Sequence, residues 1–161
     1  MINKENIRKH IVRQLRDNYD CAIKSAAAAH DAATNEESKA ENKYDTRGLE
    51  ASYLAEGQSR RVTELEQAVA TYEQLELAEF TDASSIRLTA LVTLEDAQEQ
   101  CKCFFIGPLS GGLKVAQGDI ECMVVTPEAP LGKTLIGKFV GEEIMLDIAG
   151  SKVYYSIVDI C

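Results

Sequence analysis

The sequence predicts an α+β protein in which an antiparallel helical hairpin precedes a small antiparallel β domain with one short helix. Two observations support this order. Neither Pro nor Gly occurs from Met1 to Arg47, and the apolar residues there recur at helical spacing. Beyond Glu79 the apolar residues form short runs separated by Gly and Pro, which is typical of strands and turns. The predicted boundaries are a coiled-coil hairpin over residues 1–78, a linker over 79–85 and a β domain over 86–161.

The first predicted helix runs from Asn3 or Asn6, either of which could cap it, to about residue 30. At 1.5 Å per residue it would be about 40 Å long. Its far end is lined by alanines, which would let a partner helix approach closely. Its apolar stripe recurs every four residues and consists of Ile7, Ile11, Leu15, Tyr19 and Ile23.

A polar, acid-rich segment near residues 34–45 is predicted to form the tip of the hairpin. Ser38-Lys39-Ala40-Glu41 has the pattern of a capping box, which predicts the start of the second helix. Glu37 and Glu41 are spaced i,i+4, so they would share one helix face, where like charges are unfavourable. A divalent cation such as Mg²⁺ would reverse that cost, because hard cations bind carboxylate oxygens. A solvated acidic turn is the alternative interpretation.

The second predicted helix continues to about residue 72 with a coiled-coil spacing in its later part. Gly48 and Gly57 interrupt it, and close packing against the first helix is the interpretation that we give them. Its apolar positions are Leu49, Tyr53, Val62, Leu65, Val69 and Tyr72.

Six runs beyond the linker are predicted to be strands, and one segment between them is predicted to be a short helix. Pro130 suits a first helical position and Gly137 suits the C-terminal cap of that helix. The predicted strands are 86–94, 101–106, 113–116, 121–126, 143–148 and 152–160.

The formal net charge of −9 argues against broad contact with a nucleic-acid backbone. The charge is unevenly distributed. Residues 1–30 carry six basic and three acidic side chains, whereas residues 79–161 carry six basic and twelve acidic ones. Lys9, Arg13 and Arg16 are spaced i,i+4,i+7 and form one basic helical face, which either contacts a partner or is simply solvated.

The chain has no run of the roughly 18–20 apolar residues that a membrane span needs, and no signal peptide opens it, so we expect a cytoplasmic protein. An odd number of cysteines then indicates reduced thiols, and we expect Cys101 and Cys103 to be buried structural thiols. His10 and His30 have no evident acid or nucleophile partner, so nothing indicates a self-sufficient enzyme.

The segment Thr126–Lys138, followed by Gly141-Glu142-Glu143, resembles the C-terminal signature of the bacterial Gre-type transcription elongation (transcript-cleavage) factors. That signature has a Ser/Thr-Pro stretch, a run of small residues, then Leu-Ile/Leu-Gly-Lys and a Gly-Asp/Glu turn. In the N-terminal half, Glu41-Asn42 and Glu56-Gly57 resemble the family's Glu-Asn and Glu-Gly pairs. The resemblance covers essentially the whole chain and is most specific near its C-terminus.

The resemblance implies a fold, a partner and a chemistry. In that family the second domain has an FK506-binding-protein-like fold and docks at the rim of the secondary channel of RNA polymerase, while the coiled coil reaches down the channel. Two acidic tip residues help to hold a second Mg²⁺ at the polymerase's own active centre, and the polymerase then cuts its backtracked transcript by two-metal hydrolysis. We therefore expect an accessory factor that is not itself an enzyme and has no intrinsic cofactor.

The tip departs from the family pattern. Matching Glu41-Asn42 to the family's Glu-Asn pair places Ser38 where the family keeps an Asp, and Glu37 is the obvious substitute, with Glu36 a weaker one. The resemblance and the charge pattern together predict a catalytic and Mg²⁺-binding pair, a partner-binding turn, and a face that contacts RNA or polymerase: Glu37 and Glu41; Pro130, Leu131 and Gly132; and Lys9, Arg13 and Arg16.

Three alternative functions remain open. If the tip cannot hold Mg²⁺, the protein would be a regulator that occupies the channel without promoting cleavage. An adaptor that dimerises through its coiled coil is less favoured. A prolyl isomerase is disfavoured because the chain has no Trp and only four Phe. The expected partner is RNA polymerase, with the nascent RNA 3′ end approached indirectly, no direct DNA contact, no membrane, and a monomeric state.

Overall fold

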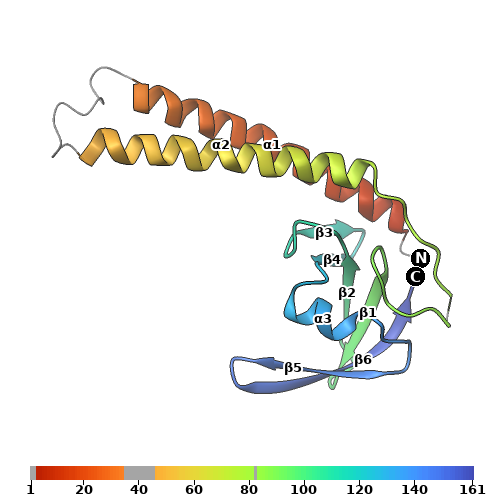
Figure 1. Cartoon of the computed structure of the whole chain (residues 1–161). Helices are drawn as coiled ribbons and strands as arrows, with labels where there is room; N and C mark the ends of the chain where they lie inside the picture. Colours follow the sequence, from red (N-terminus) through yellow and green to blue (C-terminus); the bar gives the residue numbers. More distant parts are fainter. Residues whose placement is uncertain (1–2, 35–45, 82) are drawn as a thin grey trace. The chain divides into compact units, whose positions relative to one another are not determined.

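The computed structural model describes residues 3–34, 46–81 and 83–161 (Figure 1). The chain divides into two compact units, residues 12–73 and residues 1–11 together with 74–161. The predicted order, two long helices followed by six strands with one short helix between them, is confirmed. The predicted linker boundary at 79–85 stays a prediction.

The two long helices are α1, Lys4–Thr34, and α2, Thr46–Glu73. Asn3 caps α1, since its side-chain Oδ1 accepts a hydrogen bond from the backbone N–H of Asn6 at 3.2 Å. With 31 residues α1 is about 46 Å long and ends later than predicted. The predicted capping box at Ser38–Glu41 lies outside the described residues.

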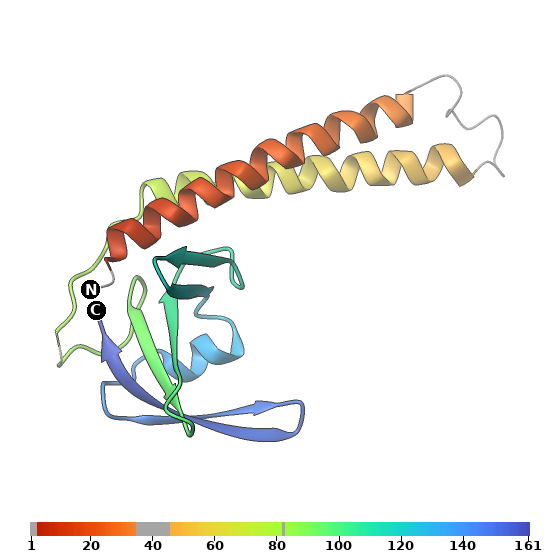
Figure 2. The same ribbon diagram turned by 180° about the vertical axis from the view of Figure 1, so that it is seen from behind.

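Helices α1 and α2 lie side by side and run in opposite directions, as both ribbon views show (Figures 1 and 2). Arg16 of α1 forms an ion pair with Glu73 of α2. The predicted four-residue stripe is wrong at Ile23, which is 41% exposed, because the seam follows a 3.5-residue repeat and passes through Ala22 instead. The buried or half-buried residues that follow this repeat are Leu15, Ala22, Ala26, Ala29 and Ala33 of α1 and Ala55, Gln58, Val62, Leu65 and Tyr72 of α2.

The β-sheet has six strands in the order β3-β4-β2-β1-β6-β5. The predicted antiparallel β domain is confirmed as a mostly antiparallel sheet, in which one described pair of neighbours, β2 with β4, is parallel. The cause is that β3 occupies the edge of the sheet, so the chain reverses twice before β4 joins β2. The strands are β1 Leu91–Asp96, β2 Cys101–Ile106, β3 Lys114–Gln117, β4 Ile120–Val125, β5 Glu143–Ile148 and β6 Ser151–Ile160.

Strand β1 begins five residues later than predicted. Ile86 exchanges hydrogen bonds with Gly137 and Lys138 rather than with a strand. Thr89 then has a φ of 71°, a left-handed conformation that is rare for a β-branched residue and interrupts the extended backbone. Its backbone N–H donates to Ile106 O, and its Oγ1 accepts from the backbone N–H of Ala78, so the buried Thr89 ties the preceding segment to the sheet.

The short helix α3, Pro130–Leu135, lies on one face of the sheet (Figure 1). Pro130 opens it as predicted, and Gly137, with a φ of 83°, follows its C-terminal end. Beneath it lies the main core of the β unit, which includes Val92, Leu94, Phe104, Ile106, Leu135, Tyr155 and Ile157.

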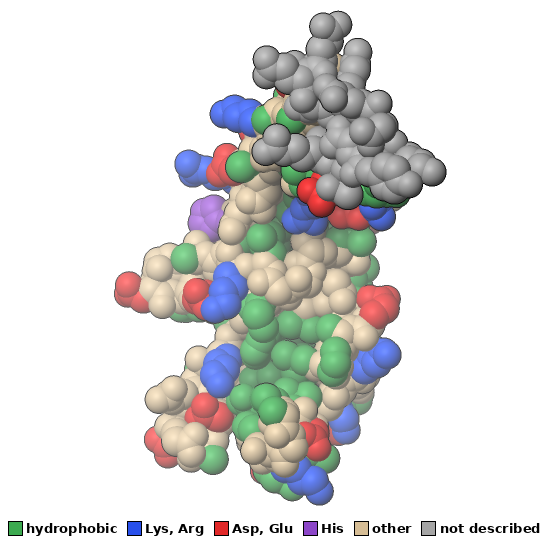
Figure 3. Space-filling view, turned by 90° about the vertical axis from the view of Figure 1, so that its left-hand side faces the viewer, with side chains coloured by type: hydrophobic (Ala, Val, Ile, Leu, Met, Phe, Trp, Pro, Cys, Tyr) green, Lys and Arg blue, Asp and Glu red, His purple; other side chains and the backbone are tan. Residues whose placement is uncertain are grey.

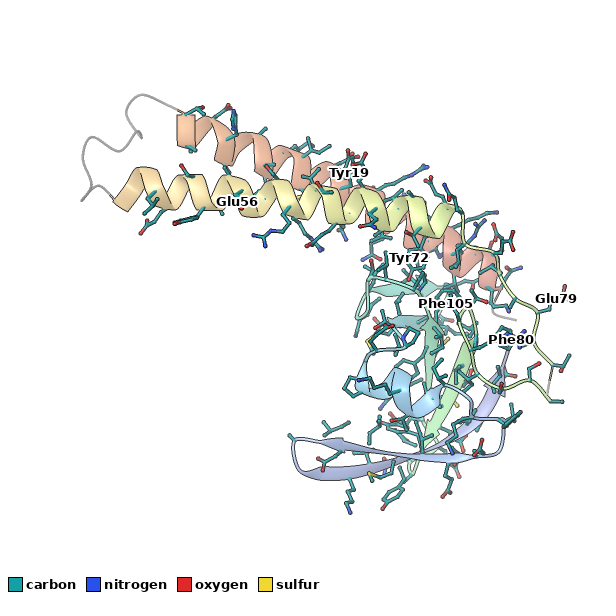
Figure 4. The ribbon with its side chains drawn as sticks, in the orientation of Figure 1. Tyr19, Glu56, Tyr72, Glu79, Phe80 and Phe105 are labelled. Carbon is teal, nitrogen blue, oxygen red and sulfur yellow. The ribbon has the colours of Figure 1, made fainter. Side chains whose placement is uncertain are left out.

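The segment between α2 and β1 is held by side chains of α1 and by its own Arg87. The Phe80 ring lies between the Lys4 ammonium, 4.4 Å from the ring centroid, and the Arg87 guanidinium, 4.7 Å away. Lys4 also donates to Ala78 O and Arg8 to Leu75 O. Figure 4 shows Glu79 and Phe80 on this segment. Burial lowers the pKa of Lys4, which indicates that its ammonium group is partly withdrawn from water.

Candidate functional site

The predicted tip residues lie outside the described residues. Glu37, Glu41 and Ser38 all fall in the segment 35–45, so the predicted Mg²⁺-binding pair stays a prediction. Within the described ranges, no group of three or more His, Cys, Asp or Glu side chains is arranged to hold a metal ion.

The predicted basic face lies along α1, and part of its charge is paired. Lys9 is 3.8 Å from Glu5, and Arg16 pairs with Glu73, whereas Arg13 is exposed. Exposed ion pairs of this kind are worth about 0–1 kcal/mol, so they could be exchanged for contacts with a partner. Contact between this basic face and RNA or polymerase therefore stays a prediction.

The predicted docking turn lies where β4 leads into α3. Pro130 is exposed, and Leu131 is half-buried against the main core. Gly132 is buried, and a Cβ atom there would stand 2.0 Å from the carbonyl oxygen of Thr126. Gly132 is therefore required by close backbone packing, and the prediction that it belongs to a partner-binding surface with Pro130 and Leu131 stays a prediction.

Pro130 and Leu131 line an apolar groove of about 320 Å³ between α3 and the end of the β5–β6 hairpin. Strand β4 forms the floor of this groove and β5 forms one wall. Residues 144, 146 and 148 of β5 lie on the same side of the sheet, because successive side chains of a strand point to opposite faces. In the lower part of Figure 3 the hydrophobic side chains gather on this face, with charged side chains around them. The apolar groove is defined by Met123, Val125, Ala129, Leu131, Leu146 and Ile148.

A second, more polar groove of about 560 Å³ shares Met123 with the first. Two ion pairs lie beside it, Lys114 with Glu121 at 2.8 Å and Lys102 with Asp96 at 3.7 Å. Backbone N–H groups of Gln100 and Gln98 donate to Asp96, and these bonds, with the nearby Lys102, hold its pKa below the ordinary value. The polar groove is defined by Thr93, Cys101, Lys102, Cys103, Phe104 and Met123.

Sequence reasoning found two lining residues of the apolar groove and missed those from β4 and β5. Ile148 carried a signal, since it is a large apolar residue next to the turn at Gly150, a place where polar residues are usual. The predicted burial is confirmed for Cys103 but not for Cys101, which is exposed because β2 extends beyond the covered part of the sheet there.

Two long antiparallel helices followed by a mixed six-stranded sheet with one short helix define the class of this structure. It is similar to the GreA factor homolog 1 (Gfh1) of Thermus thermophilus, with 18% identity, a TM-score of 0.40, and coverage of 95% of this chain and 96% of that one. For Gfh1 of Thermus aquaticus the identity is 21%, the TM-score 0.39 and the coverage 94% of each chain. For the elongation factor GreA/GreB of Nitrosomonas europaea the identity is 18%, the TM-score 0.38, and the coverage 60% of this chain and 78% of that one.

These structures come from the family that the sequence resembles. No protein-family model matches the chain, and no curated protein matches it. None of the described helices has the length and apolar character that a membrane crossing requires.

Proposed function

We propose that this protein is a Gre-type transcription elongation factor that binds RNA polymerase, inserts its helical pair into the secondary channel and stimulates cleavage of backtracked transcripts. It would act as an accessory factor, with Mg²⁺ shared with the polymerase active centre and no cofactor of its own. The observation that carries the proposal is the place of the signature residues. Pro130 and Leu131, which lie within the segment that resembles the family signature, meet at an apolar groove on the β unit.

The geometry of the groove suits a protein partner. An exposed concave apolar surface with a charged border is typical of interaction sites. Leu146 and Ile148 extend the apolar surface beyond the signature, so the docking surface would combine α3, β4 and β5.

The helical pair suits insertion into a confined space. Its distal seam is built from alanines on α1, which allows two helices to approach more closely than leucines would. Because the apolar seam is buried within one chain's helical pair, we also expect a monomer rather than an adaptor that dimerises through a coiled coil.

Docking is tested with Ile148→Asp, which places a charge in the apolar groove at a side chain that is 52% exposed. Met145→Asp is the matched control, since Met145 is also exposed on β5 but points to the opposite side of the sheet. We expect the first variant to bind core RNA polymerase at least about tenfold more weakly, a loss of about 1.4 kcal/mol, at an unchanged melting temperature. Equal binding by both variants would exclude the groove as the docking surface.

The tip is tested by a cleavage assay on a backtracked elongation complex. If Glu37 and Glu41 hold Mg²⁺ together, Glu41→Ala and Glu37→Ala should abolish stimulated cleavage while polymerase affinity stays nearly intact. Ser38→Asp should then leave activity unchanged or raise it modestly.

Ser38 favours one second candidate, a regulator that occupies the channel without promoting cleavage. In that case the native protein would be inert in cleavage and Ser38→Asp would confer activity. Equal, undiminished cleavage by the native protein and by Glu41→Ala would exclude both candidates, because the acidic tip would then have no part in the chemistry.

A further inference from the structure

Two buried cysteines face each other across neighbouring strands. In the parallel pairing of β2 with β4, Cys103 is the register partner of Cys122, so the two side chains lie on the same face of the sheet. Neighbouring strands are about 4.8 Å apart, which lies within the roughly 4.4–6.8 Å between Cα atoms that a disulfide spans. Both side chains are buried, and neither takes part in the proposed polymerase binding.

The two thiols differ in their electrostatic surroundings. The neighbouring Cys122 thiol lowers the pKa of Cys103 by stabilising its thiolate, while burial and nearby Asp159 oppose the change. The neighbouring Cys103 raises the pKa of Cys122, and burial raises it further, with a smaller contribution from Cys161. Cys103 is therefore the better nucleophile of the pair, because thiolate is the reactive form.

The two thiols also differ in their access to solvent. Cys103 lines the polar groove, which at about 560 Å³ is far larger than a small oxidant, whereas Cys122 is fully buried behind it. Cys103 can thus meet an oxidant first, with Cys122 as its register partner on the neighbouring strand.

We propose that Cys103 and Cys122 form a redox-active dithiol that hydrogen peroxide converts to a disulfide joining β2 to β4. The Cys103 thiolate attacks a peroxide oxygen, the O–O bond breaks, and a sulfenic acid forms on Cys103 as hydroxide leaves and takes a proton to become water. The Cys122 sulfur then attacks the Cys103 sulfur, the S–O bond breaks, and a second water leaves. Two thiols are oxidised and one peroxide is reduced, so atoms and electrons balance.

The sequence allows a direct test by tryptic mapping. Cleavage after Arg87, Lys102, Lys114, Lys133 and Lys152 places Cys101, Cys103, Cys122 and Cys161 in four different peptides. The reduced full-length protein is treated with hydrogen peroxide under native conditions, its remaining thiols are alkylated in denaturant, and the digest is analysed by mass spectrometry. We expect peptides 103–114 and 115–133 to be joined, with the pair lighter than its sum by two hydrogen atoms, and dithiothreitol to separate them.

Two results would overturn the proposal. One is oxidation of the exposed Cys101 while Cys103 and Cys122 remain alkylatable. The other is a bond from Cys103 to Cys101 or to Cys161 in place of Cys122.

Variants distinguish the attacking thiol from the resolving one. In Cys122→Ala, the sulfenic acid on Cys103 should accumulate and be trapped by dimedone, whereas in Cys103→Ala, Cys122 should stay reduced. Cys101→Ala is the matched control from the same strand face and should keep the bond. If either core variant fails to fold, the native protein and Cys101→Ala still decide the matter, because the joined peptide must form in both.

Discussion

Gly132 lies where α3 meets the turn before it, with the Thr126 carbonyl oxygen 2.0 Å from the place a Cβ atom would take. Gly132→Ala must therefore displace backbone, and we expect it to destabilise the protein by about 1–3 kcal/mol, as overpacking usually does. Gly111→Ala is the matched control, because its Cβ would meet Thr126 Cγ2 at an ordinary 3.4 Å. Urea denaturation of both variants measures the difference. Similar stability of the two would show that the turn can shift freely.

Asp96 stabilises the turn between β1 and β2, where its Oδ1 accepts hydrogen bonds from the backbone N–H groups of Gln98 and Gln100, both at 3.0 Å. Because its folded pKa lies below the ordinary 3.8, its charge contributes stability above that pH, and the contribution is lost as the pH falls through the folded pKa. We expect Asp96→Asn to melt at a lower temperature near neutral pH and to match the native protein in acid. Melting temperatures of both proteins across this range provide the test, and a gap that persists in acid would contradict it.

Among the helices, α2 contains a local weakness. Gly57 lies in its interior with nothing within 4 Å of an added Cβ, so close packing does not explain this glycine. Gly57→Ala should stabilise the helical pair by about 1 kcal/mol, because alanine loses less backbone entropy in a helix. Gly118→Ala, at a turn residue with a φ of 62°, should instead destabilise the protein. Thermal melts followed by circular dichroism at a helical wavelength distinguish the two effects.

Most helices and strands could be predicted from local sequence patterns. The features that the sequence did not predict depend on pairing between distant parts of the chain. The runs at 101–106 and 143–148 became strands at the predicted bounds, because alternation and turn residues are local signals. The late start of β1 depends on bonds from Ile86 to residues 137–138, and the parallel pairing of β2 with β4 depends on where β3 lies. The same distinction applies to the apolar groove. Leu131 lies in a segment that the sequence alone identifies, whereas Met123 and Ile148 reach the groove only because the strands pair as they do.

At the scale of the whole molecule, we expect the removal of the Phe80 side chain to lower the stability of packing between several elements. It packs against the main core and also lies between Lys4 and Arg87, so it ties the start of α1 to the sheet within one compact unit. We expect Phe80→Ala to cost about 1–3 kcal/mol, less than a fully buried Phe would. Phe139→Ala, which removes a 45% exposed ring, is the control and should cost little.

Urea unfolding of these two variants, followed by circular dichroism and by tyrosine fluorescence, provides the measurement. An equal loss of unfolding free energy in Phe80→Ala and Phe139→Ala would contradict this role of Phe80.

The position of β6 in the sheet has a consequence for synthesis on the ribosome. β6 lies between β1 and β5 and pairs Ile160 with Val92, so one edge of β1 has no neighbour until the chain has been made to that point. At roughly 5–20 residues per second, that edge stays open for several seconds, and an open edge invites pairing with other chains. The test is limited proteolysis of ribosome-bound nascent chains of two lengths. Chains in which Ile160 has left the ribosome should have a protease-resistant sheet, whereas shorter chains that lack β6 should not. Because residues 1–11 belong to the same compact unit as β6, segments that are synthesised at well-separated times acquire their structure together.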